Sequence, residues 1–515
     1  MTMMSERSIV MQAWAWLLLP VMLFVGFWFR PWIALPVLAA IIASAWFIFS
    51  NPPVGAASFV GAAPFQGGEK PRRVAASGVR ISSRWWWMLA VVVLYVVVSG
   101  IGGFVAQMPN DHAWRNAVFF DLARRDWPVV YDDGEGTMLC YYFAFWLPSA
   151  VVAKVAGVIR AGDVAQVLYA AWGTWIALNM IFCMSGGKPR WSVLLVFIFF
   201  NAWDVVTAFF FSEDRFSILG DPWDPHLMWL STVSDSFAAS ANPVIYNFIY
   251  NQGIAVWVFM SLFLHERNRP QRLMFLYGLL PIFAPIPALA FAPYVTFRLL
   301  AGFRRIWTVE NVTGLAVAFL SAAFLLQNNS GGHLRLVSSG GSLALQLLLS
   351  LAYYALSFGV FIFFIWKYVR RDAFYWSLIA ISVLSALVGI GTTPDLAWRM
   401  SIPAVVMTVI LLCRRVACFY RMEKWTRLAF VAVMLVGSFS SIWTFAFTLH
   451  EETCVARGER PRKYIFMMDH IDDKDYNMWY DNFVAQGDSF YRKWLMPRRQ
   501  TTEPPDDSIV RRQCQ

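Results

Sequence analysis

Residues 85–104 read WWWMLAVVVLYVVVSGIGGF, and residues 107–136, which follow almost directly, read QMPNDHAWRNAVFFDLARRDWPVVYDDGEG. The first stretch is an uncharged apolar run of 20 residues, the length that a helix needs to cross a lipid bilayer. The second gathers five polar side chains within eleven positions: Asp111, His112, Arg115, Asn116 and Asp121. Polar groups are scarce elsewhere in the chain, so their concentration at the end of a membrane helix predicts a chemical use for them.

The composition of the whole chain is that of a membrane protein. Of its 515 residues, 58% are hydrophobic and only 14% are charged, a balance that soluble domains of this size do not show. The 26 Trp and 18 Tyr residues suit a protein with many interfaces between water and lipid. Thirteen apolar runs are candidate membrane helices: Trp14–Phe29, Ile33–Phe49, Trp85–Phe104, Val164–Met184, Trp191–Phe211, Tyr246–Leu264, Leu273–Pro285, Ile286–Leu300, Val312–Leu326, Leu343–Trp366, Ala373–Gly391, Ile402–Leu412 and Leu428–Leu449. The sequence therefore predicts an all-α polytopic membrane protein with about 12–13 transmembrane helices.

Lys and Arg are unevenly shared between the loops that connect these runs. Twenty-one basic residues lie in one set of loops, at 51–84, 185–190, 265–272, 298–309, 367–372 and 413–427. Six basic and twelve acidic residues lie in the opposing loops, at 105–137, 212–245, 327–342 and 392–401. Because basic loops stay on the cytoplasmic side, the first set is predicted to be cytoplasmic and the second to face outward. The net charge of +10 reflects this orientation, and no nucleic acid is expected as a partner.

The run 139–158, LCYYFAFWLPSAVVAKVAGV, is apolar enough to span the membrane. If it did, every later loop would change sides and the basic residues would face outward. We therefore expect a re-entrant or interfacial helix on the outer side, bent at Pro148. Such a segment is tolerated only where it is buried in protein or lines a water-filled cavity, so the run also predicts a cavity that opens outward.

These features divide the chain into five parts. They are an N-terminal transmembrane hairpin at 1–50, a cytoplasmic linker at 51–84, a transmembrane core at 85–300, further membrane helices at 301–449 and a small extracytoplasmic tail at 450–515. No internal repeat and no inverted pair of broken helices is visible, which disfavours a transporter. Cys454 and Cys514 both lie in the tail, where they would either form a disulfide or remain free thiols.

Asp111 is the strongest candidate for chemistry in the loop 105–137. A carboxylate at the membrane surface can take a proton from a hydroxyl or bind a divalent cation, and His112 beside it could tune that carboxylate or contact a phosphate. Helical spacing places Arg115 one turn from Asp111, and Asn116 and Asp121 on the same short helix are further candidates for substrate binding. Asp111 could instead only cap this helix, and Asp121 could belong to a solvated or salt-bridged face.

Aromatic and amide side chains are mixed within and after the loop 212–245. The candidates for substrate binding are His226, Trp229, Asn251 and Gln252, with Asn242 and Tyr246 between them. Rings stack on the apolar faces of sugars and amides bond hydroxyls, so this mixture predicts a sugar-binding surface. An ordinary belt of interfacial aromatic residues is the alternative.

Isolated charges on the outward side or inside the membrane need partners. Arg399, which begins a membrane helix, and Arg335 with His333 could bind a lipid phosphate, whose shape the guanidinium fork matches. An ion pair with Asp395, four residues earlier, is equally open for Arg399. Asp204 lies within an apolar run, which marks either a functional acid or a hydrogen bond between helices.

The order of these features resembles the GT-C superfamily of integral-membrane glycosyltransferases, which use polyprenyl-phosphate sugars. Asn110-Asp111-His112 lies where that superfamily carries an acidic motif in its first extracytoplasmic loop, and 139–157, ending in AKVAG, is similar to its juxtamembrane helix. The resemblance covers 85–300 and implies that Asp111 is the catalytic acid/base or a metal-associated carboxylate. This chain has Asp-His in place of a pair of acids, and the hairpin before residue 50 has no counterpart.

Together the residues and the resemblance imply a bacterial inner-membrane glycosyltransferase of inverting type, with its site facing the periplasm, that serves cell-envelope polysaccharide biosynthesis. Its partners would be membrane lipid, a polyprenyl-phosphate-linked sugar and a glycan, lipid or protein acceptor, with Asp111 and His112 catalytic. A divalent cation, Mg or Mn, is the one cofactor left open. A polymerase or ligase of lipid-linked polysaccharide is the nearest alternative, and a transporter or flippase of lipid-linked sugar is the next. The chain has no GK[ST] loop, HExxH or GxSxG motif, so nucleotide-driven chemistry is not expected.

Overall fold

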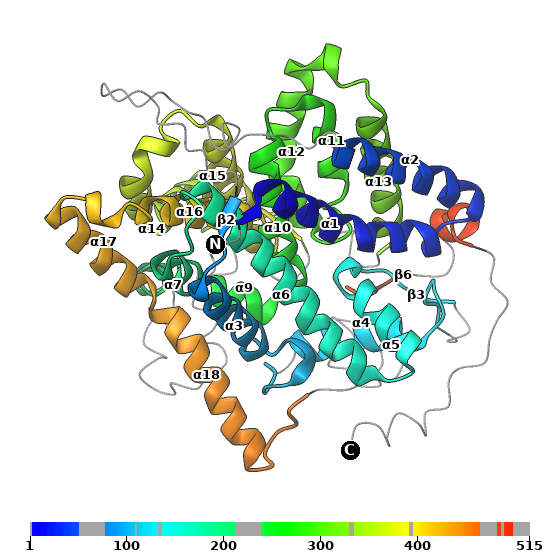
Figure 1. Ribbon diagram of the computed structural model, residues 1–515, viewed down its shortest axis with the longest axis horizontal. Coiled ribbons are helices and arrows are strands. Elements are labelled where there is room, and N and C mark those ends of the chain that lie inside the picture. Colours follow the sequence, from blue (N-terminus) through cyan, green and yellow to red (C-terminus); the bar gives the residue numbers. More distant parts are fainter. Residues whose placement is uncertain are drawn as a thin grey trace.

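The computed structural model describes residues 3–50, 78–108, 111–131, 136–211, 239, 241–328, 334–390, 395–463, 482–485 and 489–497. Helices provide most of the regular structure in this part of the chain (Figure 1). They are α1 (Glu6–Trp28), α2 (Pro31–Ser50), α3 (Ser83–Val98), α4 (Asp111–Arg124), α5 (Leu147–Ala156), α6 (Ile159–Met184), α7 (Trp191–Phe199), α8 (Asp204–Phe211), α9 (Asn242–Phe248), α10 (Tyr250–Glu266), α11 (Pro270–Gly278), α12 (Pro285–Ala301), α13 (Val309–Leu325), α14 (Leu343–Val369), α15 (Ala373–Ser385), α16 (Asp395–Val416), α17 (Lys424–Gly437) and α18 (Phe439–Ala456).

Pairs of short antiparallel strands join segments that lie far apart in the sequence. They are β1 (Met3–Ser5) with β2 (Gly78–Arg80), β3 (Met138–Leu139) with β6 (Val484–Ala485), and β4 (Leu334–Leu336) with β5 (Val388–Ile390). Strands of two or three residues are too short to build a core of their own. They therefore act as ties between loops of a helical bundle.

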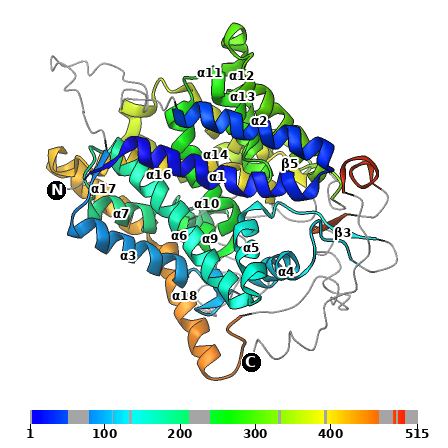
Figure 2. The ribbon, with the colours of Figure 1, turned by 45° about the vertical axis from the view of Figure 1, so that its right-hand side comes forward.

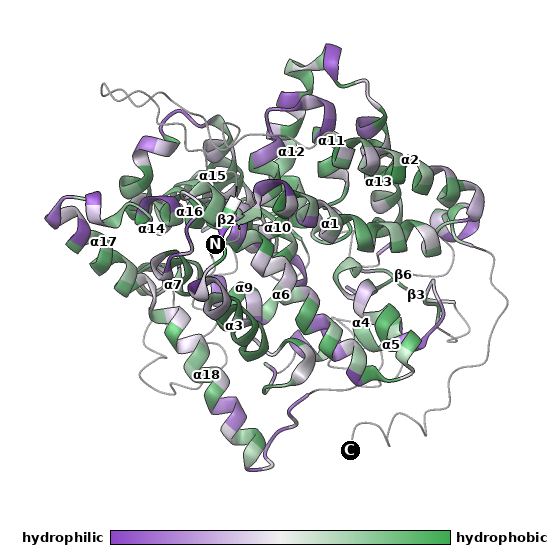
Figure 3. Cartoon of the chain, in the orientation of Figure 1, coloured by the Kyte–Doolittle hydropathy of each residue, from purple (hydrophilic) through white to green (hydrophobic). Residues whose placement is uncertain are grey.

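Within the described residues, six helical segments are long and apolar enough to cross a membrane: α1, α2, α6, α14, most of α16, and α17 with α18. Large apolar side chains on them are exposed, such as Trp46 and Phe363, each 71% exposed. Apolar surface of this kind suits contact with lipid tails. Figure 3 shows hydrophobic colour along the helices and hydrophilic colour at the tip of the α11–α12 pair and at the far end of α18. The chain is a multi-pass helical membrane protein, as the sequence predicts.

The apolar run 139–158 does not form a helix of membrane length. It is divided into β3, a 3-10 turn at Ala144–Trp146 and α5, which has ten residues. Ten helical residues rise about 15 Å, half of the ~30 Å hydrocarbon core. The chain leaves α5 at Gly157, which has a left-handed φ of 67°. The run therefore contains no helix of spanning length, and its expected place on the outer side stays a prediction.

Two predicted membrane helices are interrupted, so the expectation of continuous helices at 191–211 and 246–264 is wrong. The first divides into α7 and α8, and between them Trp203 has a left-handed φ of 59°. The second divides into α9 and α10 at Ile249, whose φ of −135° and ψ of 36° are not helical. Non-helical backbone at this depth is tolerated where protein surrounds it.

The end of α7 lies against the start of α9. The Asn242 N–H donates to the Phe200 carbonyl at 3.0 Å, and its side-chain amide donates to the Phe197 carbonyl at 2.7 Å. Trp257 Nε1 donates to the Asn242 side-chain oxygen at 2.9 Å. Amide side chains that bond nearby carbonyls compete with helical hydrogen bonds, which favours the end of α7 at this point.

The expectation of a membrane span at 273–285 is also wrong, because α11 and α12 form a short hairpin. The nine residues of α11 rise about 14 Å, less than half of the bilayer core. At the turn, the ring of Phe283 stacks on Trp16 near the middle of α1, with 5.5 Å between centroids. At the other end, Gly302 packs on Pro270, so both helices return to the same side.

The loops predicted to be cytoplasmic meet one another, and we call this side of the bundle the basic end. Three contacts join them: Arg80 N to the Gly187 carbonyl at 3.0 Å, His265 Nε2 to the Glu6 carboxylate at 3.6 Å, and Arg267 Nη1 to Asp372 Oδ2 at 3.0 Å. The loops that carry most of the basic residues therefore share one end, as the distribution of Lys and Arg predicts.

The opposite side, which we call the α4 end, gathers the predicted outward segments. Three contacts join them: Asn328 Nδ2 to the Cys140 carbonyl at 2.7 Å, Ala106 N to Glu452 Oε2 at 2.7 Å, and Arg30 N to the Leu495 carbonyl at 2.8 Å. In Figures 1 and 2, α4, α5 and the far end of α18 lie away from the α11–α12 hairpin. The bundle thus has two chemically different ends.

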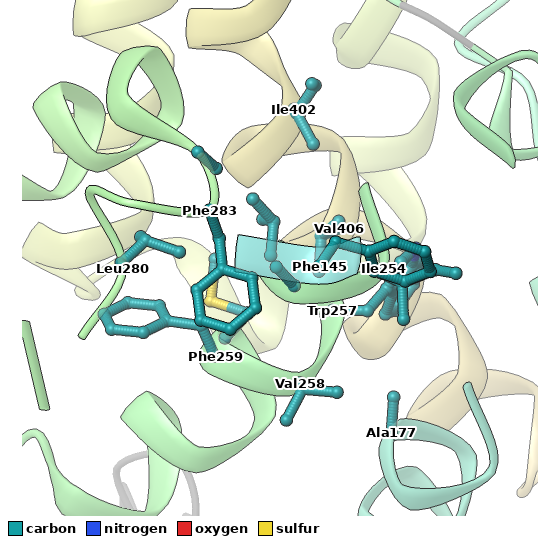
Figure 4. Packing of buried hydrophobic residues seen from close by; sticks show 14 of the residues in the cluster. Phe145, Ala177, Ile254, Trp257, Val258, Phe259, Leu280, Phe283, Ile402 and Val406 are labelled. Carbon is teal, nitrogen blue, oxygen red and sulfur yellow. The ribbon is translucent and has the colours of Figure 1, made fainter. Parts of the chain in front are cut away.

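The centre of the bundle is built around α10, all of whose residues are buried. Figure 4 shows Ile254 and Trp257 from this helix among side chains that include Phe283 of the α11–α12 turn and Val406 of α16. A helix that is apolar on most of its circumference belongs inside a large core. This position places the first turn of α10 within the protein, on the side of the α4 end.

Candidate functional site

Asp111 begins α4 and forms an ion pair with Arg115. Arg115 Nη1 donates to Asp111 Oδ1 at 2.8 Å, as the spacing of four residues on a helix predicts. Only 4% of the Arg115 side chain is exposed, against 30% of Asp111. Burial alone would lower the pKa of Arg115, but the Asp111 carboxylate raises it overall, so the guanidinium stays charged. Asp111 is therefore an oriented and partly accessible carboxylate at a helix N-terminus, where negative charge is favoured.

His112 follows directly and is buried in its neutral form. Its Nε2 lies 2.6 Å from the Asn247 carbonyl, and since a carbonyl only accepts, Nε2 carries the proton and Nδ1 keeps a lone pair. Burial, and then the charge of Arg115, lowers the pKa of His112 to about 3. The ring stacks on Tyr250 with 5.6 Å between centroids. Nδ1 has no hydrogen-bond partner in the described part of the chain, so it is an acceptor available to a ligand.

Arg399 reaches the same region from α16, although it lies far away in the sequence. Its Nη1 donates to the Tyr142 hydroxyl at 2.6 Å. The Tyr142 and Tyr141 rings lie 3.7 Å apart, and Tyr141 is within electrostatic range of both Arg115 and Arg399. Burial, and then Tyr142, raises the pKa of Tyr141 well above its ordinary value, so its phenol keeps a proton to donate. Two guanidinium groups therefore flank a pair of tyrosines next to Asp111.

Asn251 and Gln252, the predicted substrate-binding amides, lie in the first turn of α10. They are 0% and 1% exposed, respectively. Neither the oxygen nor the nitrogen of either side chain has a hydrogen-bond partner in the described residues. The preceding residue, Tyr250, accepts a hydrogen bond from Trp146 Nε1 at 3.2 Å and stacks on His112. The amides thus follow directly on the residue that contacts the α4 cluster.

Asp121 and Asn116 are held by other protein groups. The Tyr131 hydroxyl donates to Asp121 Oδ2 at 2.7 Å, and Arg125 Nε lies 3.6 Å from its other oxygen. Asn116 Nδ2 donates to the Gln107 side-chain oxygen at 2.6 Å. Asp121 is fully buried, and its ion pair matches the salt-bridged alternative that the sequence left open.

The remaining sequence candidates are not placed in this cluster. Arg335 is exposed on β4, opposite Gly389, and no contact in the described residues joins it to Asp111. Several candidates lie outside the described residues: His226, Trp229, His333 and the side chains of Asp204 and Asp395. A partner of Arg399 that the structure does describe is Tyr142, on the run 139–158.

Residues that the sequence did not single out hold the Asp111 loop in place. The Ala106 N–H donates to Glu452 Oε2 at 2.7 Å, which ties the loop to the end of α18. Lys463 Nζ donates to Asp163 Oδ1 at 2.6 Å, and 11% and 4% of these two side chains are exposed. Asp163 and Glu452 are acids near the ends of apolar helices, and that position was the signal which could have identified them.

The described residues do not favour a metal site at Asp111. They contain no group of three or more His, Cys, Asp or Glu side chains that could hold a metal ion. The cation beside Asp111 is Arg115, whose positive charge would repel a second one. We therefore assign no step to Mg or Mn. Cys454 forms no disulfide with another described residue, and Cys514, its predicted alternative partner, lies outside the described residues.

No protein-family model, curated protein or solved structure matches this chain. The comparisons therefore add no support to the GT-C resemblance. Function is inferred below from the chemistry of the side chains and from their geometry.

Proposed function

We propose that this chain is a GT-C-like membrane glycosyltransferase that moves a sugar from a polyprenyl-phosphate donor to an acceptor on the outer face of a bacterial inner membrane. One observation carries the proposal: the Asp111 carboxylate, held by Arg115, and the Arg399 guanidinium are gathered around Tyr141 and Tyr142. A base and a cationic site for phosphate are the two groups that such a transfer needs.

Asp111 is the proposed general base. The acceptor hydroxyl attacks the anomeric carbon of the sugar while the bond from that carbon to the phosphate oxygen breaks. The hydroxyl proton passes to a carboxylate oxygen of Asp111, and the bonding electrons leave with polyprenyl phosphate. A single displacement of this kind inverts the anomeric centre. Arg115 orients the carboxylate, and His112 supports the first turn of α4 through its bond to the Asn247 carbonyl.

Arg399 and the tyrosine pair are the proposed site of the leaving phosphate. A guanidinium offers donors in a planar fork that matches a phosphate, and the protonated Tyr141 adds a further donor. Groups that stabilise charge developing in the transition state contribute about 10²–10³-fold in rate each. Arg399 lies in the first turns of α16 at the α4 end, the depth at which a membrane-bound carrier lipid places its phosphate.

Two alternatives use the same features differently. A polymerase or ligase of lipid-linked polysaccharide would share this chemistry and differ only in the size of its acceptor. A transporter or flippase of lipid-linked sugar is favoured by one observation, the interruptions at α7–α8 and α9–α10, because broken helices form the substrate sites of many transporters. The ion pair of Asp111 and Arg115 favours transfer, since transport alone needs no general base.

The test is transfer by purified protein in lipid nanodiscs. Short-chain polyprenyl phosphates that carry different hexoses or pentoses serve as donors, extracted cell-envelope glycans serve as acceptors, and mass spectrometry detects the product. We expect transfer by the wild type, none by Asp111→Asn, and wild-type transfer by Asp126→Asn, an exposed carboxylate in the same loop. If no donor yields product but the same lipids cross sealed liposomes, the protein is a transporter and the proposal is wrong.

A further inference from the structure

The side chains of Asn251 and Gln252 are buried without hydrogen bonds in the described part of the chain. Together they provide two carbonyl oxygens and two NH₂ groups. Burial of such groups without partners opposes folding, so polar side chains of this kind normally find one. Two adjacent exceptions in a helix whose residues are all buried require a reason outside the protein's own hydrogen bonds.

Other buried amides of this chain show the usual arrangement. Asn242 donates to the Phe197 carbonyl and accepts from Trp257. Gln346 donates to the Ala386 carbonyl at 2.9 Å and accepts from the Ser339 hydroxyl at 2.5 Å. Both are as deeply buried as Asn251 and Gln252. The exception is therefore specific to the first turn of α10.

We propose that Asn251 and Gln252, together with His112 Nδ1, recognise the hydroxyl groups of an uncharged sugar. This inference rests on the proposed function, which assigns a polyprenyl phosphate as the carrier of that sugar. Sugar hydroxyls both donate and accept, so they match amides, which do the same. Tyr250 stacks on His112 and directly precedes Asn251, so His112 lies beside the first turn of α10.

The charge of these groups selects the class of sugar. Both amides are neutral, and His112 is neutral because burial lowers its pKa to about 3. A sugar carboxylate placed among them would be buried without a counter-ion, which is strongly unfavourable. Of the cations nearby, Arg115 is paired with Asp111, and Arg399 is the group that we assign to the lipid phosphate. Neutral hexoses or pentoses are thus expected to bind, and uronic acids are not.

The experiment compares stability with binding in four variants of the full-length protein in nanodiscs. Asn251→Leu and Gln252→Met keep the approximate shape of each side chain but remove the polar atoms. Asn242→Leu and Gln346→Met are the matched controls, because they remove amides that are bonded. The probes are short-chain polyprenyl phosphate alone and the same carrier with glucose, mannose, arabinose or glucuronic acid. Thermal midpoint and probe affinity are measured for each variant.

We expect Asn251→Leu and Gln252→Met to raise the thermal midpoint of the ligand-free protein, because they remove polar groups that have no partners. The controls should lower it. In the wild type, at least one neutral sugar should tighten binding of the carrier by about tenfold, the effect of one or two neutral hydrogen bonds. The two site variants should lose this gain and still bind the bare carrier.

Two results would overturn the inference. One is a fall in midpoint for Asn251→Leu and Gln252→Met equal to that of the controls, which would make these amides structural. The other is equal affinity for the carrier with and without sugar. Failure of the proposed function would look different. If a neutral sugar tightens binding of the carrier, the site variants lose this gain, and no sugar is transferred to any acceptor, the sugar-binding site stands and the glycosyltransferase function is rejected.

Discussion

Asp111→Asn separates the two roles that the sequence leaves open for this residue, a base and a helix cap. Asn and Asp serve equally well at a helix N-terminus, and the amide oxygen still accepts from Arg115. The variant loses a negative charge that faces a guanidinium only 4% exposed. A hydrogen bond to a charged group contributes about 1.5–3 kcal/mol and a neutral one about 0.5–1.5 kcal/mol, so the expected loss of stability is about 1–2 kcal/mol. The rate should fall about 10²–10⁴-fold.

The assay pairs sugar transfer at saturating donor with thermal unfolding followed by tryptophan fluorescence. Asp111→Leu provides the structural comparison, since it removes the acceptor and leaves Arg115 buried without a partner, at a cost of about 3 kcal/mol or more. If Asp111 only caps the helix, the Asn variant should be active within a few-fold of wild type and the Leu variant should be impaired. That pattern would refute the assignment of Asp111 as the base.

Three further predictions concern single contacts. Arg399→Lys keeps the charge but loses the fork, so the donor KM should rise while the thermal midpoint changes little; an unchanged KM would exclude Arg399 from the phosphate site. Asp163→Asn should cost about 3 kcal/mol because it leaves Lys463 with a buried charge, and the double variant with Lys463→Met should recover most of it; additive losses in a double-mutant cycle would contradict this. The pKa of His112 falls from about 6.5 in the unfolded chain to about 3 in the folded protein. The stability that neutral His112 contributes is therefore present above pH ~6.5 and is lost as the pH falls toward 3. His112→Phe should reduce this dependence of the thermal midpoint on pH.

Much of the architecture could be predicted because it depends on local composition. Apolar length identifies the long helices, and the distribution of Lys and Arg predicts the grouping of loops at the basic end. The same charge argument predicted that 139–158 would not span, and α5 within it has only ten residues. The interruption of 191–211 could not be predicted, because it depends on Asn242 bonding carbonyls of another helix. The short α11–α12 hairpin likewise depends on the contact of Phe283 with Trp16.

Some contacts of the candidate site could also be predicted from the sequence, and others could not. The Asp111–Arg115 pair follows from the spacing of four residues within one helix. The approach of Arg399 to Tyr142 depends on how α16 packs near the run 139–158, and no local pattern carries that information. The missing partners of Asn251 cannot be read from a sequence at all, since any buried amide could have found one. Sequence therefore predicts which residue types are unusual, and only the fold shows which of them are left without partners.

The irregular parts of this bundle converge on one helix, and that convergence has a physical reason. The α9–α10 interruption directly precedes the first turn of α10. Phe200, beside the α7–α8 interruption, is bonded to Asn242, whose side chain accepts from Trp257 of α10. The α11–α12 turn packs nearby in the core that α10 fills. Non-helical backbone within a membrane leaves polar groups that lipid cannot satisfy, so it persists only where protein or a wet cavity surrounds it. A bundle that needed only to span the bilayer would gain stability from continuous helices. The interruption at Ile249 precedes Tyr250, which stacks on His112 of α4. A ligand that bonds Asn251 and Gln252, the next two residues, would recover part of the stability that the interruption costs.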